Sequence, residues 1–165
     1  MPFESVNIFE QDFWEINENL ELLRKDSNAE SIILIDKAGQ LITSAGDISA
    51  MDMSAFASLS AADFAATSQL AILIGETEFN TLFHQGKNLS LHVSVIAQSV
   101  ILVVIFSGKT TLGLIRLKVK VYSQKLDEIF KRIFGKLGAA REKREDEFDD
   151  NFFDEADNEI DNLFT

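Results

Sequence analysis

The stretch SGKTT at residues 107–111 is the part of this sequence most similar to a nucleotide-binding motif. It follows an apolar run typical of a strand and precedes a helical pattern, as phosphate-binding loops do. The complete motif requires a glycine five residues before Gly108, and that position is Val103. Without a glycine-rich loop, few backbone N–H groups are free to hold phosphates. We therefore predict a polar strand-to-helix loop here.

His84 and His92 are the two histidines of a chain that contains no cysteine. Because no carboxylates flank them at ligand spacing, they form a poor metal set. We expect both to lie on strands and to form local hydrogen bonds. Ser90 and Ser94 alternate with apolar residues and are predicted to form the polar face of a half-exposed strand. The sequence therefore predicts no catalytic residue, no metal, no cofactor and no enzyme activity of its own.

Composition and charge narrow the classes of partner. The chain has 165 residues, is 46% hydrophobic and carries a net charge of −12. Most of the negative charge lies after Gly138. An acidic protein is a poor ligand for polyanions, so we expect no nucleic acid and no membrane as partners. The apolar runs are too short for a membrane helix, no signal peptide is recognisable, and the absence of cysteine suits a reducing compartment. The predicted location is the cytoplasm.

The periodicity of apolar residues predicts helices and strands in a definite order. A helix over 9–25 precedes a β-hairpin over 31–46, which turns at Asp36-Lys37-Ala38-Gly39. A second helix follows Asp52 and ends near Ile74. Strands are predicted over 81–86, 88–96 and 99–106, and a last helix from Thr110 to about Leu137, ended by Gly135 and Gly138. We expect one domain over 1–137, a charged linker over 138–150 and an acidic amphipathic helix over 151–165.

The second helix carries a stripe of small side chains. The stripe consists of Ser54, Ser58, Ala61, Ala65 and Ser68, at alternating steps of four and three. Small side chains let another backbone approach closely, so the stripe predicts a helix–helix contact in a dimer while bulkier residues face the sheet. The alternative is a merely alanine-rich exposed helix, since alanine is the best helix former.

The C-terminal residues combine acids with apolar side chains at helical spacing. The apolar positions include Phe153, Ile160, Leu163 and Phe164. This pattern is typical of a short helix that docks in a groove of a partner. Two alternatives to this docking are a disordered acidic segment and a helix that docks on its own domain.

Several blocks of the chain together resemble the Roadblock family. They are ILIDKAGQLITSAG, FASLSAADFAATSQLAILIGE and FHQGKNLSLHVSVIAQSVILVVIFSGKTTLGLIRLKVK, within residues 9–134. The resemblance implies an α+β sandwich: a five-stranded antiparallel sheet with one helix on one face and two on the other. It also implies a homodimer in which the second helices of both subunits lie side by side.

The resemblance further implies a regulator of a small Ras-like GTPase. The similar members bind the GTPase asymmetrically, two subunits to one. They accelerate GTP hydrolysis without an arginine finger and help to set front–rear polarity, so enrichment at a cell pole is expected. The alternative is a dimeric scaffold of the same fold that binds a GTPase or polarity proteins without accelerating hydrolysis.

By position, the resemblance places the GTPase-binding surface on the second helix and the strand before it. The residues are Ile42, Thr43, Ala61, Ala62, Ala65, Ser68, Gln69 and Ile72. The tail from Phe153 to Phe164 resembles a segment that binds the GTPase at a second place. Asp63, Ser68 and Gln69 stand where the family tends to have asparagine and glycine.

Overall fold

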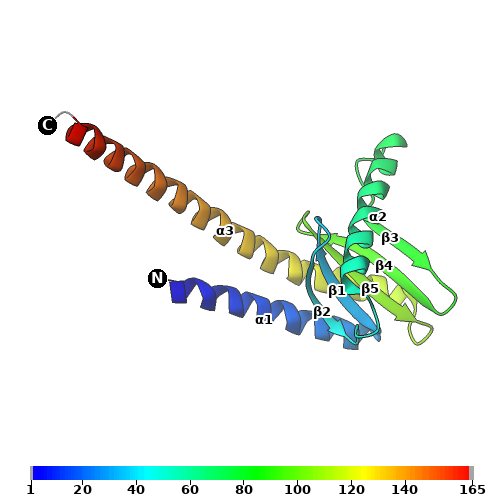
Figure 1. Cartoon of the computed structure of the whole chain (residues 1–165). Coiled ribbons are helices and arrows are strands. Elements are labelled where there is room, and N and C mark those ends of the chain that lie inside the picture. The colour runs from blue at the N-terminus through cyan, green and yellow to red at the C-terminus, as the bar shows by residue number, and fades with distance from the viewer. Residues whose placement is uncertain (1, 164–165) are drawn as a thin grey trace. The chain divides into compact units, whose positions relative to one another are not determined.

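The computed structural model describes the backbone of residues 2–163 and the side chains of residues 9–146 and of Leu163. Its elements follow the predicted order of helices and strands (Figure 1). They are α1 (Pro2–Ser27), β1 (Ser31–Asp36), β2 (Leu41–Gly46), α2 (Met53–Leu73), β3 (Thr81–Gln85), β4 (Leu89–Ile96), β5 (Val100–Ser107) and α3 (Leu112–Leu163). The chain forms two compact units, Met1–Phe130 and Lys131–Thr165, which are described separately.

The five strands form one antiparallel sheet in the order β2-β1-β5-β4-β3. The predicted hairpin is formed by β1 and β2, and Gly39 adopts a left-handed φ of 89° in its turn. Strand β5 is central and apolar on both faces, which agrees with its continuous run of buried residues. Strands β2 and β3 are the edges of the sheet.

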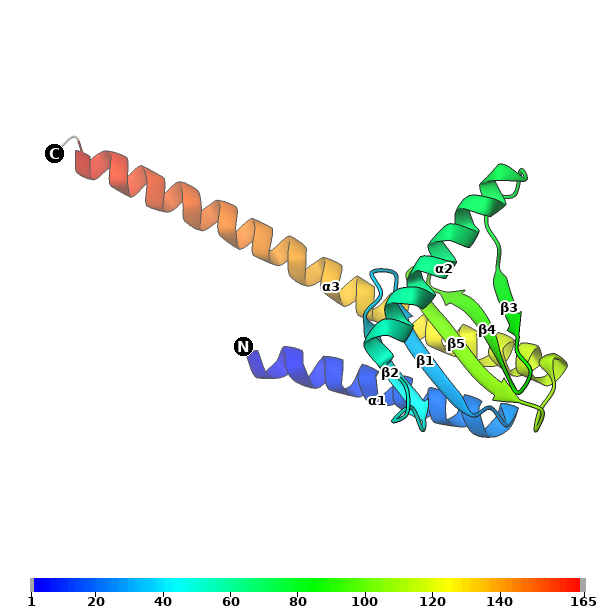
Figure 2. The same cartoon turned by 45° about the vertical axis from the view of Figure 1, so that its right-hand side comes forward.

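Helices cover both faces of the sheet within the first unit. Figures 1 and 2 show α2 on one face, with α1 and the start of α3 on the other. Under α2, a core cluster joins Ala57 and Ala61 to alternate side chains of β1 and β5, such as Ile33 and Ile101. On the opposite face, the Tyr122 hydroxyl of α3 donates a hydrogen bond to Asp26 of α1. The predicted arrangement of one helix against two is confirmed.

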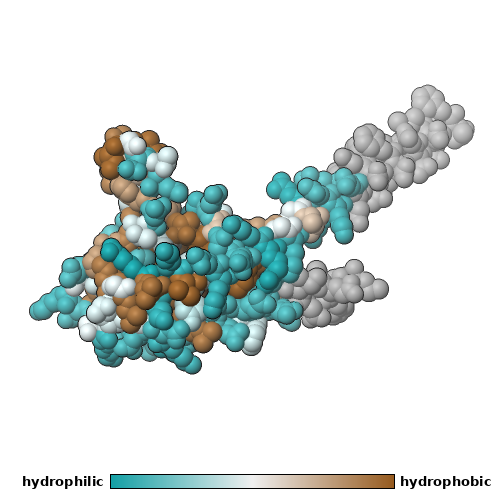
Figure 3. Space-filling model, turned by 180° about the vertical axis from the view of Figure 1, so that it is seen from behind, coloured by the Kyte–Doolittle hydropathy of each residue, from teal (hydrophilic) through white to brown (hydrophobic). Residues whose placement is uncertain are grey.

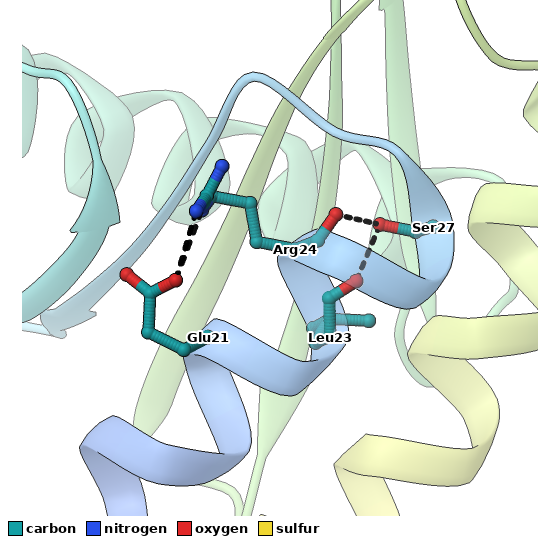
Figure 4. Close-up of polar contacts among 4 residues, drawn as sticks. All are labelled: Glu21, Leu23, Arg24 and Ser27. Carbon is teal, nitrogen blue, oxygen red and sulfur yellow. Dashed lines mark hydrogen bonds and ion pairs between the residues drawn. The ribbon is translucent and has the colours of Figure 1, made fainter.

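Side chains satisfy the backbone at the end of α1 (Figure 4). The Ser27 hydroxyl donates to the carbonyl oxygen of Leu23 at 2.6 Å. Arg24 forms an ion pair with Glu21 at 3.0 Å, one turn earlier. Asn28 follows in a left-handed conformation, with φ of 55°. Asparagine tolerates that conformation well, which explains why the helix ends at Ser27, two residues after the predicted end.

Helix α3 is longer than predicted. The sequence predicts an end at Gly135 or Gly138, but the helix continues to Leu163, so residues 138–150 are helical. A glycine inside a helix costs only about 1 kcal/mol relative to alanine. The residues that follow are strong helix formers, and Arg141 pairs with Glu145 one turn later at 3.3 Å. Two isolated glycines are therefore too weak a signal to end this helix.

Two polar residues of β4 are buried rather than half-exposed, whereas Ser90 is half-buried. His92 is 1% exposed and Ser94 is 7% exposed. The register pairs His92 with Val104 and Ser94 with Leu102, so both lie on the face that α1 and α3 cover. No hydrogen-bond partner for the ring nitrogens of His92 exists among the described residues. The prediction of a locally bonded His92 and an exposed Ser94 is therefore wrong, because α3 covers this face.

Acid is expected to destabilise the protein through His92. Burial, and then the positive charge of Arg116, lowers the pKa of His92 in the folded state. In the unfolded chain the pKa is about 6.5, so below that pH the unfolded state binds a proton that the folded state does not. The stabilisation is complete above about pH 6.5 and is lost as the pH falls below it.

We therefore expect the free energy of unfolding, measured in urea, to fall between about pH 7 and about pH 5.5. His92→Leu should make that decline shallower, because it removes the titrating group. Equal declines in the two proteins would contradict this origin of the pH dependence.

Candidate partner-binding surface

Helix α2 has well-defined ends. The Asp52 carboxylate accepts a hydrogen bond from the backbone N–H of Ala55 at 3.1 Å, as an N-cap does. At the other end, the N–H of Glu76 donates to the carbonyl oxygen of Ala71 at 2.9 Å, and Gly75 has a φ of 88°. These caps hold the helix intact to its last turn, although that turn is exposed.

The face of α2 against the sheet is lined by small residues. Ala57, Ala61 and Ala71 are buried there, while Phe56 and Phe64 are partly buried against the same core. The sequence predicts that bulky residues face the sheet and that a small-residue stripe faces away. That assignment is wrong for Ala61, which belongs to the core, and the buried stripe is displaced from the predicted one.

A close approach between two backbones explains part of this pattern. A β-carbon added to Gly39 would lie 3.0 Å from the Cα of Ser58. The turn between β1 and β2 therefore lies directly against α2, and a bulky residue would not fit at this contact. The second backbone near the small residues is thus, in part, the hairpin of the same chain.

The opposite side of α2 is an exposed stripe of leucine and alanine. Leu59, Leu70 and Leu73 are 69%, 57% and 80% exposed. Ala55 before them and Ala62 and Ala66 between them are also exposed, so the stripe follows helical spacing along the whole element. We call these six residues the α2 stripe. Figure 3 shows hydrophobic surface gathered at the projecting end of this helix.

Sequence reasoning missed the leucines of the α2 stripe as site residues. The signal was the second apolar spacing of three and four residues through 55, 59, 62, 66, 70 and 73. A helix that is apolar on two sides has one side for the core of its own domain and one for another partner.

A polar pair fixes α2 to the edge of the sheet. The carboxylate of Asp63 lies 2.7 Å from Nε2 of His84 on β3. Leu82, two residues before His84, packs against the core under α2. Strand β3 pairs with β4 on one side only, so its other side presents open backbone groups next to the exposed helix.

The predicted partner-binding residues do not form one surface. Ala62, Ala65, Gln69 and Ile72 are exposed on α2, and Ser68 is half-buried, its hydroxyl bonded to the carbonyl oxygen of Phe64. Of the other predicted dimer residues, Ser54 and Ser58 are exposed and Ala61 is not.

The two predicted residues of β2 are half-buried. Ile42 forms part of the edge strand. Thr43 donates a hydrogen bond to the side-chain oxygen of Asn17 on α1 at 2.6 Å, so it lies on the face opposite α2. The structure therefore brings the α2 residues together and leaves Thr43 apart from them.

A cavity of about 670 Å³ adjoins the end of α2. Phe64, Ser68 and Ile72 line it from the helix, together with Phe79 of the following loop and Asp127 of α3. Two of the predicted partner-binding residues, Ser68 and Ile72, therefore flank a hollow that a side chain of a partner could enter.

The tail residues fall mostly outside the part that can be described. Leu163 is 80% exposed, while the side chains of Phe153, Ile160 and Phe164 lie outside the described residues. The docking role of the tail stays a prediction.

The SGKTT loop at residues 107–111 forms polar contacts within the protein. The Ser107 hydroxyl donates to Glu30 at 2.8 Å, and the Lys109 amine lies 3.6 Å from the same carboxylate. Thr111 caps α3 by accepting a hydrogen bond from the N–H of Leu114. The groups that would hold a phosphate instead surround an acid, which disfavours nucleotide binding here. No cluster of three metal-ligating side chains was found in the described part of the chain.

By length and hydropathy alone, α2 is the one helix among the described residues that could cross a membrane. A core helix of a globular domain meets the same criterion. One side of α2 packs on the sheet, and Asp63 near its middle pairs with His84. This arrangement favours protein over lipid as the neighbour of its exposed side.

Comparison with known proteins gives a consistent result. Myxococcus xanthus MglB is 46% identical to this chain, with a TM-score of 0.70 over 73% of this chain and 90% of MglB. The gliding protein MglB of Thermus thermophilus is 29% identical, with a TM-score of 0.69 over 73% of this chain and 92% of that one.

An MglB solved in a tetrameric arrangement is 29% identical, with a TM-score of 0.68 over 73% of this chain and 91% of that one. No curated protein matches the chain. The model of the Roadblock/LC7 domain matches residues 15–106, which is more than half of the sequence. The chain therefore belongs to the Roadblock/LC7 family.

Proposed function

We propose that this protein is an MglB-like GTPase-activating regulator. In this proposal it forms a homodimer, binds a small Ras-like GTPase of the MglA type and stimulates its GTP hydrolysis. The observation that carries the proposal is the exposed α2 stripe. It occurs in a chain whose sequence is 46% identical to that of M. xanthus MglB. The regulated process would be cell polarity and gliding motility, in the cytoplasm and with enrichment at a cell pole.

The α2 stripe supports the dimer. The three leucines of the stripe are between 57% and 80% exposed, so burying each of them would stabilise a dimer by about 1–2 kcal/mol. In a two-fold symmetric dimer the same stripe is buried twice, once from each subunit. The open edge of β3 lies beside this helix, so a second copy would also satisfy unpaired backbone groups. Ala62 and Ala66 between the leucines would let the two helices approach closely.

The GTPase would bind to the residues of α2 that remain exposed after the dimer has formed. Ala65, Gln69 and Ile72 flank the stripe and stay exposed, next to the cavity lined by Ser68 and Ile72. These side chains can provide a complementary surface and hydrogen bonds to the GTPase. They include neither a catalytic base nor a cation that could act on the γ-phosphate of GTP. The regulator would therefore act by fixing the catalytic loops of the GTPase, which is positioning and electrostatic stabilisation. If one GTPase molecule covers the α2 helices of both subunits, the complex contains two subunits and one GTPase.

The tail would serve as a second contact. Residues 138–165 carry eleven acidic and three basic side chains, and Leu163 is exposed at their end. An acidic helix with apolar positions suits a basic groove on the GTPase. We propose that it tunes the regulator and is not required for activation.

The test is phosphate release by the organism's MglA-like GTPase, loaded with GTP, with and without the protein. The full chain and a shortened chain that ends at Gly138 should both accelerate release, on the order of tenfold or more. A shortened chain that still activates, but to a different extent than the full chain, would make the tail a modulator.

A complex that forms without acceleration would refute activation and favour the dimeric scaffold. In that case this protein would bind the GTPase or polarity proteins without changing turnover. Gel filtration of the mixture with a GTP analogue distinguishes absent binding from silent binding.

A further inference from the structure

We propose that a cavity between the edge of the sheet and α3 binds a small oxyanion of the phosphate type. The cavity has a volume of about 380 Å³. Its polar lining consists of Thr81, His92, Ser94, Arg116, Lys120 and Ser123. We call it the α3 cavity. All of these residues belong to the unit Met1–Phe130.

Three elements place these side chains together. The register pairs Thr81 of β3 with Ser94 of β4, and His92 lies two residues before Ser94 on the same face. Arg116, Lys120 and Ser123 follow at steps of four and three on α3, so they share one side of that helix. The helix crosses this face of the sheet, which brings the two sets to one hollow.

The α3 cavity concentrates polar atoms that lack a partner. Among the described residues, three side chains that line this cavity have buried polar atoms without a hydrogen-bond partner. These atoms are both ring nitrogens of His92 and the hydroxyls of Ser94 and Ser123. His92 is 1% exposed and Ser94 is 7% exposed. Buried polar groups in native proteins are almost always satisfied, so such a cluster points to a bound polar group.

The charge of the lining selects the kind of ligand. Arg116 and Lys120 are the charged side chains of the lining, and no carboxylate accompanies them. The lining is therefore positively charged, whereas the protein as a whole has a net charge of −12. Burial lowers the pKa of His92, so at neutral pH its imidazole is uncharged and offers one N–H donor. Two cations, hydroxyls and an N–H match the acceptor oxygens of an oxyanion, whereas a cation would be repelled.

Water alone is a weaker account of the same lining. Water molecules would satisfy the hydroxyls and the imidazole. They would also solvate Arg116 and Lys120, which are both exposed, but they would supply no negative charge to pair with these cations. An oxyanion satisfies the hydrogen bonds and neutralises the charge at once.

The site is separate from the proposed GTPase surface. The α3 cavity is lined by residues of α3, whereas the stripe belongs to α2. Figures 1 and 2 show α2 and the start of α3 on opposite faces of the sheet. Failure of the activation experiment therefore leaves this proposal intact, and failure of this one leaves the activation proposal intact.

The test is a titration of the full chain with inorganic phosphate in a phosphate-free buffer, followed by NMR of the two histidine rings. We expect saturable binding in the millimolar range or tighter. The ring signals of His92 should shift, and those of His84, paired with Asp63 on the other face, should not. Absence of saturation, or equal shifts of both histidines, would overturn the proposal.

Substitutions define the site. Arg116→Gln and Lys120→Gln should each weaken phosphate binding roughly tenfold, since each removes a charge-assisted hydrogen bond. Both side chains are exposed enough for the fold to tolerate the change, which circular dichroism can check. Lys125→Gln is the matched control, because Lys125 lies on the same helix over the ring of Tyr122 and outside the cavity. Equal weakening by the control would mean non-specific attraction and would overturn the proposal.

A second titration distinguishes two sources of the same group. Inorganic phosphate and AMP present the same oxyanion, alone or as an ester. Tighter binding of AMP would assign the α3 cavity to phosphate esters, and tighter binding of inorganic phosphate would assign it to the free anion. Either result supports the oxyanion site.

Discussion

Alanine in place of Gly46 is expected to lower the free energy of unfolding by about 3 kcal/mol or more. Gly46 ends β2 with a φ of 89°, a conformation that costs alanine about 1–2 kcal/mol. An added β-carbon would also lie 2.4 Å from the carbonyl oxygen of Glu30 and 3.0 Å from the Cα of Ser31. Both atoms belong to the backbone, so relief requires β1 and β2 to move apart. The two costs add because they have different origins.

Substitutions at two other glycines distinguish the cost of the left-handed φ from the cost of the steric contact. Gly75 has a φ of 88° but nothing within 4 Å of an added β-carbon, so Gly75→Ala measures the conformational cost alone. Gly113 lies in the first turn of α3 with open space around it and no left-handed φ, so Gly113→Ala should be neutral or slightly stabilising. Urea unfolding of the three variants measures the differences. Equal losses for Gly46→Ala and Gly75→Ala would show that the contact with Glu30 is not tight.

The elements themselves were predictable because their signals are local. Alternating residues in β4, the apolar run of β1, the turn at Asp36–Gly39 and the cap at Asp52 each fix a short segment without reference to the rest. This explains why the five strands agree with the sequence, while the end of α3, marked only by two isolated glycines, does not. The arrangement of the layers was implied by the resemblance to the Roadblock family and not by these local signals.

The side of each strand or helix that is buried was harder to predict than the position of the strand or helix in the sequence. His92 alternates like an exposed residue, yet α3 covers it, and only the tertiary arrangement determines that. The sides of α2 presented the same difficulty, because the helix has two apolar sides and small residues on both. The side that meets the sheet is defined by contacts between residues distant in sequence, such as the approach of Gly39 to Ser58. The exposure of the candidate residues of α2 therefore could not be predicted from the sequence, and their role in binding a partner stays a prediction.

Arginine in place of Leu59 is expected to convert the proposed dimer to a monomer and to abolish activation of the GTPase. Leu59 is 69% exposed within the α2 stripe and contributes to no core of its own subunit, so the change should not unfold the domain. A symmetric interface loses two leucines, worth about 2–4 kcal/mol together because each is already partly buried, and gains two unpaired charges. The dissociation constant should therefore rise roughly 100-fold or more, since about 1.4 kcal/mol corresponds to a factor of ten.

Leu117→Arg is the matched control for this change. Leu117 is 57% exposed on α3 and lies outside the α2 stripe, so the same substitution there should leave both the dimer and the activation unchanged. Analytical ultracentrifugation measures the assembly and phosphate release measures the activation. A Leu59→Arg protein that stays dimeric would place the interface elsewhere, with the open edge of β3 as the next surface to test. A monomer that still activates would show that one α2 helix suffices to position the loops of the GTPase, and would refute the two-to-one stoichiometry.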